Sequence, residues 1–270
     1  MKKVFLIIFW VLFAVGLILI VFFASKENNN TVAKKPDISI HVEGENAFLT
    51  ESELLDRLIY KRLYQKNMKV NVVNVKKIES AIIKMEEVKK VRVYKNIGNS
   101  WNIDVELRNP IARIFTLSQK AYYLDDEGFT MGRSSLHTAH VLVFSGFITE
   151  NMEKASVKEI INNDSLKSIR KLDDIYRISS YVCKDPFFNS QIGQIYLEKN
   201  GDFLLVPRVG DQKIIFGTAH NRLEVSAKFR KLADFYAQGI PYEGWSTYNC
   251  INLKYKNQVV CSKKENNIEK

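Results

Sequence analysis

Apolar residues fill the start of the chain without interruption and alternate with polar residues afterwards. From Val4 to Ala24 no side chain is charged, and a helix of that length spans the roughly 30 Å hydrocarbon core of a bilayer. A cleavable signal sequence has a shorter apolar core and small residues before its cleavage site, where this chain has Phe22 and Phe23. The pattern therefore predicts an uncleaved transmembrane helix with a short cytoplasmic stub over residues 1–25. The lysines nearest to it favour a cytoplasmic N-terminus, although the total counts on its two sides are nearly equal.

A polar segment over residues 26–36 follows and predicts a tether. Over residues 37–110 the periodicity changes from strand to helix and back. Helices are expected after a capping box formed by Thr50 and Glu53 and near Asn74. The segments with strand periodicity are 38–42, 88–93 and 101–107. Strand, helix, helix, strand, strand predicts a small α+β domain whose two helices cover one face of a three-stranded sheet. We expect 101–107 to be a half-buried antiparallel strand.

Short strands and two helical stretches make up the longer block, residues 111–261. An acidic turn at 125–128 and the Asn200-Gly201 pair predict tight connections between strands. Helical periodicity appears over 166–176 and over 225–236, and Gly239 and Pro241 are expected to end the second helix.

The last strands of this block are expected over 248–255 and 258–260, and residues 262–270 are expected to form a disordered tail. The block predicts a mostly antiparallel α+β domain, although the pattern leaves the fold of 131–170 open. The fold class of the whole chain is therefore α+β, with a single N-terminal transmembrane helix.

Composition and charge exclude a collagen-like, a fully disordered and a disulfide-dense protein, and they argue against nucleic-acid binding. The chain is 46% hydrophobic and 26% charged, as in an ordinary globular protein. The net charge of +10 is spread thinly along the sequence, whereas a nucleic-acid-binding protein concentrates its cations on one element. We therefore expect no nucleic acid among the partners.

Motifs for catalysis, metals and cofactors are missing from the sequence. His137 and His140 have no acidic or cysteine neighbours in a zinc-ligand pattern, and the acidic turn at 125–128 lacks the later ligands of a calcium loop. Phosphate-binding glycine motifs and the nucleophile-elbow motif do not occur. We expect no catalytic residues, cofactor, metal or small-molecule substrate. Cys250 and Cys261 would meet if their segments pair, and are otherwise lone buried thiols.

Several segments resemble a known family. Residues 88–93 and 101–112 resemble the second half of a POTRA domain, and 38–46 resemble its first half. Residues 123–128, 228–232 and 251–260 resemble the β domain of the FtsQ/DivIB cell-division family. Together with the apolar N-terminus, they resemble that family's order of anchor, POTRA domain and β domain.

The resemblance implies a bitopic scaffold of the bacterial division machinery that is not an enzyme. Its N-terminus would be cytoplasmic, its helix would lie in the inner membrane, and its folded domains would be periplasmic at the septum. The implied partners are FtsB/DivIC-like and FtsL-like proteins, which control septal peptidoglycan synthesis.

In that family the terminal strand region of the β domain binds a segment of the FtsB/DivIC partner by strand addition. Backbone groups then give affinity and alternate side chains give specificity. The matching positions here are Tyr255, Asn257, Val259 and Val260. The alternative is that Val259 and Val260 simply complete the core.

Two other functions stay open. A POTRA-type chaperone of outer-membrane assembly would normally come with a long series of alternating strands that form a membrane barrel. An anchored cell-wall enzyme would need paired carboxylates or an activated nucleophile. The sequence shows neither signature clearly.

Overall fold

The computed structural model describes residues 2–44, 46–96, 98–134, 137–150 and 171–264. These residues form two compact units. The first unit comprises Met1–Glu43 with Ala47–Leu107, and the second comprises Gly44–Asn46 with Arg108–Lys270. Each unit has its own buried core.

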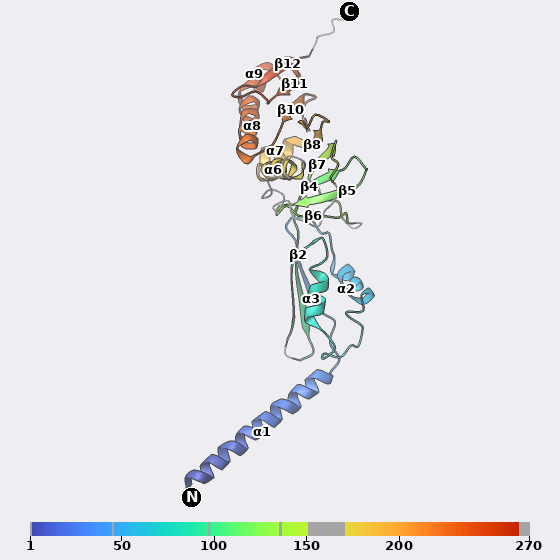
Figure 1. Ribbon diagram of the computed structural model, residues 1–270, viewed down its shortest axis with the longest axis vertical. Helices are drawn as coiled ribbons and strands as arrows, with labels where there is room; N and C mark the ends of the chain where they lie inside the picture. Colours follow the sequence, from blue (N-terminus) through green and yellow to red (C-terminus); the bar gives the residue numbers. More distant parts are fainter. Residues whose placement is uncertain (1, 45, 97, 135–136, 151–170, 265–270) are drawn as a thin grey trace, which may run out of the picture. The chain divides into compact units, whose positions relative to one another are not determined.

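Helix α1 covers Lys2–Asn30 and is drawn in blue in Figure 1. It supplies the continuous helical backbone that the apolar start of the chain predicted. Over the residues that the structure describes, however, no helix combines the length and the apolarity that crossing a membrane requires. The transmembrane helix expected from Val4 to Ala24 is therefore not found.

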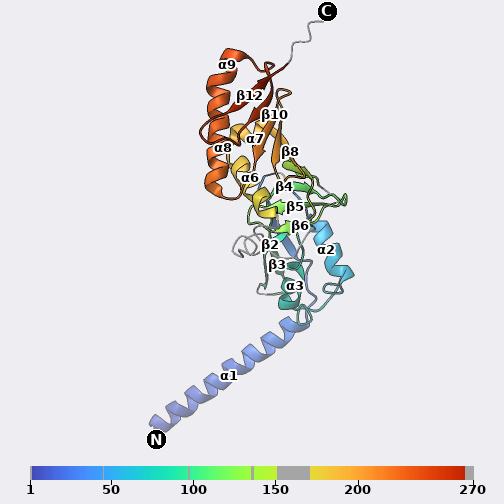
Figure 2. The same ribbon diagram turned by 45° about the horizontal axis from the view of Figure 1, so that its top comes forward.

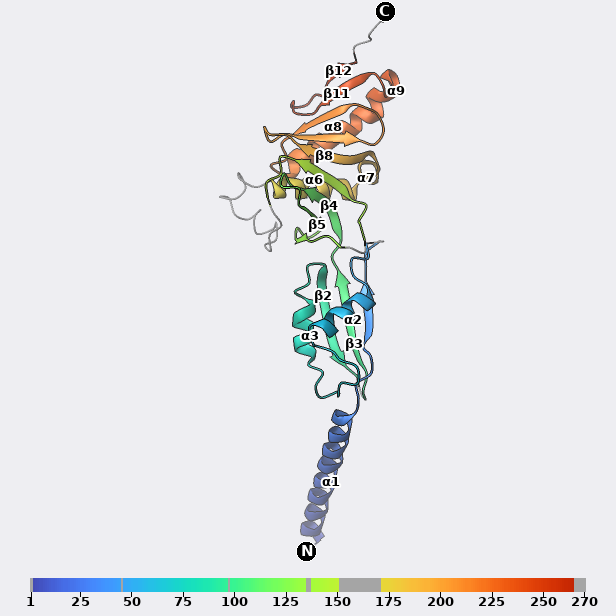
Figure 3. The ribbon, with the colours of Figure 1, turned by 90° about the vertical axis from the view of Figure 1, so that its right-hand side faces the viewer.

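The remaining elements of the first unit follow the predicted order of strand, helix, helix, strand, strand. They are β1 (Asp37–His41), α2 (Glu51–Tyr60), α3 (Val75–Ile82), β2 (Val88–Lys95) and β3 (Trp101–Leu107). The sheet order is β1-β3-β2, and Figure 3 shows α2 and α3 against one face of this sheet. β3 alternates buried and half-buried residues as expected. It is antiparallel to β2 but parallel to β1, so the prediction of an antiparallel strand holds on one side only.

Side-chain caps begin both helices at the predicted residues. The Thr50 hydroxyl accepts a hydrogen bond from the Glu53 N–H at 3.3 Å, and the Asn74 side chain accepts one from the Lys77 N–H at 3.0 Å. The Glu53 carboxylate does not complete the capping box. It accepts a hydrogen bond from Arg57, four residues later on the same helix face, at 2.7 Å.

The segment expected to be a tether differs from that expectation. α1 continues to Asn30, and Val32 forms an isolated bridge with Lys69. Ala33 is buried, and its N–H donates to the Met68 carbonyl at 2.8 Å. Backbone pairing with the loop after α2 therefore attaches this part of the segment to the first unit.

A nine-stranded sheet forms the second unit (Figures 1 and 2). Its strands are β4 (Pro110–Phe115), β5 (Ala121–Asp125), β6 (Thr130–Met131), β7 (Leu142–Gly146), β8 (Ile192–Leu197), β9 (Phe203–Pro207), β10 (Lys213–Gly217), β11 (Tyr248–Asn252) and β12 (Val260–Lys263). The sheet order is β12-β11-β10-β9-β8-β7-β4-β5-β6. Five neighbouring pairs are antiparallel, whereas β4/β7, β7/β8 and β10/β11 are parallel. The prediction of a mostly antiparallel sheet is confirmed.

Helices cover one face of this sheet (Figure 2). They are α6 (Leu172–Lys184), α7 (Pro186–Gln191), α8 (Arg222–Asp234), a π-helical turn η1 (Phe235–Gly239) and α9 (Ile240–Glu243). The expected end at Gly239 and Pro241 is wrong, because the helix continues to Glu243. A proline lacks only an N–H that the first turn of a helix leaves unpaired, and Pro241 lies in the first turn of α9. Gly244, with φ 87°, ends it.

Two further expectations concern less regular parts of the chain. β12 continues to Lys263, two residues into the expected tail 262–270, because Ser262 and Lys263 pair with β11. Residues 265–270 lie outside the described residues. Within 131–170 the structure describes β7, whereas 151–170 lie outside it, including part of the helical stretch expected over 166–176.

Candidate functional site

β12 forms one edge of the nine-stranded sheet. Among the described elements it pairs only with β11, in the register Cys250↔Ser262, Ile251↔Cys261 and Asn252↔Val260. The other side of an edge strand presents backbone N–H and C=O groups that no strand uses. A partner strand adds to a sheet at this kind of position.

The pairing with β11 determines which residues of β12 present these groups. The Lys264 N–H donates to the carbonyl of Thr247, the residue directly before β11, at 2.9 Å. Backbone groups along an antiparallel strand alternate in direction, so the N–H groups of Ser262 and Val260 also face β11. The N–H groups of Cys261 and Lys263 consequently face the free edge.

The four residues predicted for partner binding take different positions. Val260 begins β12 and is 42% exposed, whereas Val259 packs against the core beneath the helices. Tyr255 and Asn257 lie in the connection between β11 and β12, where Asn257 has a φ of 59°. The structure thus brings all four to one end of the sheet, but only Val260 belongs to the edge strand. Val259 instead takes the position of the alternative interpretation, in which it completes the core.

Helix α8 holds the β11–β12 connection through Lys231. Its ammonium group donates to the carbonyl oxygens of Leu253 at 2.8 Å and Tyr255 at 2.6 Å. Burial, and then the charge of Lys228, lower the pKa of Lys231. Lys231 is not among the site residues predicted from the sequence. Its only signal was its place in the segment 228–232 that carried the family resemblance.

A basic groove lies between α8 and the same connection. Its volume is about 540 Å³, and its lining includes five basic side chains and two acidic ones: Lys228, Arg230, Lys231, Lys254, Lys256, Glu224 and Asp234. Lys228 pairs with Glu224 at 2.5 Å, and Lys254 pairs with Asp202 at 2.6 Å, whose hydrogen bond and charge raise the pKa of Lys254. The excess of positive charge favours an acidic segment as the occupant of the groove.

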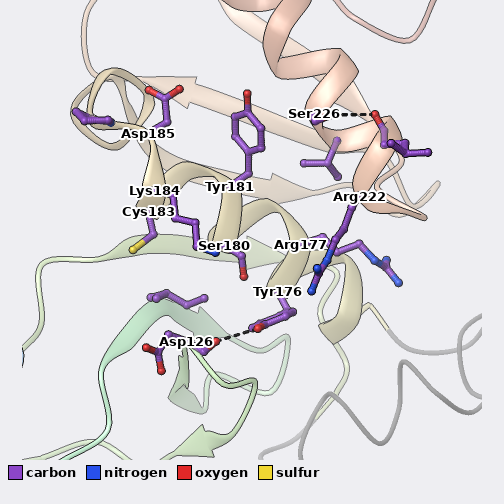
Figure 4. Close-up of a pocket in the computed structure, with 14 residues that line it drawn as sticks. Asp126, Tyr176, Arg177, Ser180, Tyr181, Cys183, Lys184, Asp185, Arg222 and Ser226 are labelled. Carbon is purple, nitrogen blue, oxygen red and sulfur yellow. Dashed lines mark hydrogen bonds between the residues drawn. The ribbon is translucent and has the colours of Figure 1, made fainter.

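A second cavity, of about 650 Å³, opens between α6, the first turn of α8 and the turn after β5 (Figure 4). The Tyr176 hydroxyl donates to the Asp126 carbonyl at 2.8 Å across its floor. Burial, and then the charge of Asp126, raise the pKa of the Cys183 thiol. Burial and then Asp185 likewise raise the pKa of Tyr181. Both changes favour the protonated, less nucleophilic form.

Buried ions beside this cavity hold elements together. Arg177 donates to Asp173 and to Asp174, both at 2.7 Å, and to the Ala219 carbonyl at 2.8 Å. These bonds join α6 to the loop before α8. Asp173, Asp174 and the Ala219 carbonyl together account for the hydrogen bonds of Arg177 described here. We therefore assign this cluster a role in stability and not in catalysis or ligand binding.

The cysteines and histidines do not form a metal site in the part of the chain that the structure describes. Within that part no three His, Cys, Asp or Glu residues come close enough to hold a metal ion. Cys250 and Cys261 lie on neighbouring strands and are free. Their register differs by one residue, which directs the two side chains to opposite faces of the sheet.

Comparisons with known proteins identify two domain families along the chain. A family model described as "FtsQ/DivIB, C-terminal related" matches residues 109–262, which is more than half of the chain. A model of a POTRA-like domain matches residues 31–106. No curated protein sequence matches the chain.

Proposed function

Because the chain belongs to the FtsQ/DivIB family, we propose that it is a non-enzymatic cell-division scaffold that binds its partners at the edge of β12. The FtsQ/DivIB-related and POTRA-like domains support a cell-division scaffold in general. The observation that carries the proposal is the free edge of β12, where Cys261 and Lys263 present outward N–H groups. A strand bound there would become the tenth strand of the sheet.

The proposed partners are FtsB/DivIC-like and FtsL-like proteins, through which the scaffold would help to regulate septal peptidoglycan synthesis. Tyr255, Asn257, Val259 and Val260 are the proposed contact residues. The basic groove beside them supports a partner segment that carries acidic side chains next to its added strand.

The proposed location is the division septum of the inner membrane. The N-terminus would be cytoplasmic and both folded units periplasmic. Membrane fractionation of cells, followed by protease treatment of spheroplasts, tests this. We expect the chain in the membrane fraction, with both units digested from outside. Recovery in the soluble fraction would contradict it.

A proline at residue 263 tests the edge assignment. Lys263→Pro removes an outward N–H without removing a bond to β11, and an edge strand tolerates proline when the lost N–H faces solvent. We expect the affinity for the extracytoplasmic region of the FtsB/DivIC-like protein of the same bacterium to fall about tenfold in calorimetry.

Lys263→Ala is the matched control, because it removes the same side chain and its 2.9 Å ion pair with Glu243 but keeps the N–H. We expect it to bind the partner like the wild type. Equal affinities of the two variants, both folded, would refute the edge assignment.

Depletion of the protein in its own bacterium separates the proposed function from its alternatives. Microscopy is expected to show long filaments without septa. Normal division with loss of outer-membrane proteins would instead indicate an assembly chaperone. Lysis with intact septa would indicate a cell-wall enzyme.

A further inference from the structure

The segment that joins α2 to α3 in the first unit is strongly basic. Residues 61–77 carry no acidic side chain, and their basic side chains are all exposed: Lys61, Arg62, Lys66, Lys69, Lys76 and Lys77. We call these six residues the basic cluster. The ion pairs that the structure describes in the first unit join Arg57, Lys89 and Lys90 to glutamates. Within the described residues, therefore, no carboxylate pairs with the basic cluster.

The path of the chain places this segment at one end of the first unit (Figure 3). β2 ends at Lys95, whose ammonium group donates to the Val70 carbonyl of the segment at 2.6 Å. β2 begins at Val88, directly after Glu86 and Glu87, so these two carboxylates lie at the opposite end of the strand. The first unit therefore has a basic end, although its acidic residues leave its net charge small.

Helix α1 ends beside the same segment. The Val70 N–H donates to the carbonyl of Thr31, the residue directly after α1, at 3.0 Å. Among the described residues of α1, exposed large apolar side chains occur from Leu6 to Phe22. Exposed apolar surface of this extent is typical of a site that contacts another molecule or a membrane. An exposed apolar helix and a cluster of cations are thus joined by a direct backbone hydrogen bond.

We propose that the basic cluster binds the anionic headgroups of a phospholipid bilayer. A bilayer offers cations a negatively charged surface and offers apolar side chains a hydrocarbon layer directly below it. Val32 and Val72, exposed by 48% and 56% near the cluster, would also contact this boundary. A nucleic acid would attract the cations but leave the apolar side chains of α1 in water.

The inference rests on one part of the proposed function, the location at the inner membrane, and adds the class of lipid that the first unit recognises. Attraction to an anionic bilayer increases with each basic side chain near its surface and falls off within about 10 Å. Exposed cations without carboxylate partners keep their full charge for this attraction. The cluster should therefore distinguish anionic lipids from zwitterionic ones.

Lysine acetylation tests the proposal on the full chain in lipid nanodiscs. The nanodiscs contain either phosphatidylcholine alone or phosphatidylcholine mixed with phosphatidylglycerol, and mass spectrometry measures the acetylation rates of Lys76 and Lys77. We expect these two lysines to react about fivefold more slowly in the anionic lipid, because bound headgroups shield their amines. Lys199, an exposed lysine of the second unit, is expected to react at the same rate in both lipids.

Two pairs of substitutions separate the basic cluster from charge in general. Lys66→Gln combined with Lys69→Gln removes two charges from the cluster and should abolish most of the difference between the lipids at Lys76 and Lys77. Lys120→Gln combined with Lys199→Gln is the matched control, because it removes two charges from exposed positions of the second unit. We expect this control to keep the full difference.

The outcomes separate this proposal from the one on which it rests. Equal rates of Lys76 and Lys77 in the two lipids would overturn the lipid proposal, while recovery of the chain in the membrane fraction of cells would leave the proposed location standing. Equal rates together with recovery in the soluble fraction would contradict both. Equal protection of these lysines by duplex DNA, added to phosphatidylcholine nanodiscs, would assign the cluster to polyanions in general and overturn the lipid proposal.

Discussion

Asp125 shows how one buried carboxylate can fix a turn of the backbone. It is completely buried, and it accepts hydrogen bonds from the N–H groups of Glu127 at 3.0 Å and Phe129 at 2.6 Å. Arg108 completes its surroundings with an ion pair at 2.8 Å. The residue types at 125–128 predicted the turn. They could not predict Arg108, because that contact depends on β4 and β5 pairing first.

Removal of this carboxylate is expected to be costly. Asp125→Ala leaves Arg108 and two backbone donors without their acceptor, and breaking a buried pair in this way costs about 3–5 kcal/mol. Urea denaturation is expected to show a lower midpoint with an unchanged slope. Asp211→Ala is the control, because Asp211 is 87% exposed in its 3.3 Å pair with Lys264, and such pairs contribute about 0–1 kcal/mol. Similar losses in the free energy of unfolding for Asp125→Ala and Asp211→Ala would show that burial of the Asp125 carboxylate does not determine its contribution.

Glu224 is expected to make stability depend on pH. Burial by itself raises the pKa of the Glu224 carboxyl, but hydrogen bonds from Lys228 and Thr218 outweigh it and leave the pKa below its ordinary value. A carboxyl whose pKa is lower in the folded state stabilises the fold above its unfolded pKa of about 4.3. The stabilisation is lost as the pH falls through the folded value.

Glu224→Gln is therefore expected to lower the free energy of unfolding at pH 7, and the difference from the wild type should shrink as the pH approaches 3. Urea titrations between these values measure it. Glu243→Gln serves as the control at a more exposed ion pair. A difference that stays constant with pH would show that Glu224 acts through packing instead.

At the scale of elements, local patterns predicted individual strands and turns but not the order of the sheets. The alternation over 101–107 defined β3, and Asn200-Gly201 gave the turn between β8 and β9, where Gly201 has a φ of 89°. Parallel pairs such as β1/β3 and β10/β11 join segments far apart in sequence, and no local periodicity encodes them. The same holds for the candidate site. The family resemblance located the closing strand, whereas which of its backbone N–H groups face outward depends on its register with β11.

The coupling of α8 to the β11–β12 connection gives a prediction about an element. Lys231→Met removes two hydrogen bonds from an ammonium group to the carbonyls of Leu253 and Tyr255, each contributing about 1.5–3 kcal/mol. We expect amide hydrogens in 254–258 to exchange at least about tenfold faster, with little change in β8 and β9. Arg230→Met, at an exposed position of the same helix, is expected to leave amide exchange unchanged both in 254–258 and in β8 and β9. Uniformly faster exchange would indicate global destabilisation instead of a local role.

At the scale of the molecule, the two units have separate cores. Trp101 is central to the first and lies 5.7 Å from Tyr64 between ring centroids, whereas Phe229 stacks with Tyr181 at 4.6 Å in the second. The two core clusters share no residue. We therefore expect each unit to unfold in its own transition, with its own free energy of unfolding.

Differential scanning calorimetry of the wild type is expected to show two transitions. Trp101→Ala and Phe229→Ala should each cost about 3–5 kcal/mol, and each should move only the transition of its own unit. A common shift of both transitions by either variant would show that the units unfold cooperatively.

The register of β12 against β11 decides which of its residues meet the core. Residues one apart on a strand point to opposite faces and direct their backbone groups in opposite directions. A slip of β12 by one residue would therefore turn Val260 towards the core, expose Cys261, and exchange the inward and outward N–H groups, whereas a slip by two would preserve all three features. The irregularity between Tyr248 and Cys250 shows that β11 takes up one extra residue without such a slip. An insertion is therefore tolerated where a bulge or the connection takes it up, and not where β12 itself has to shift.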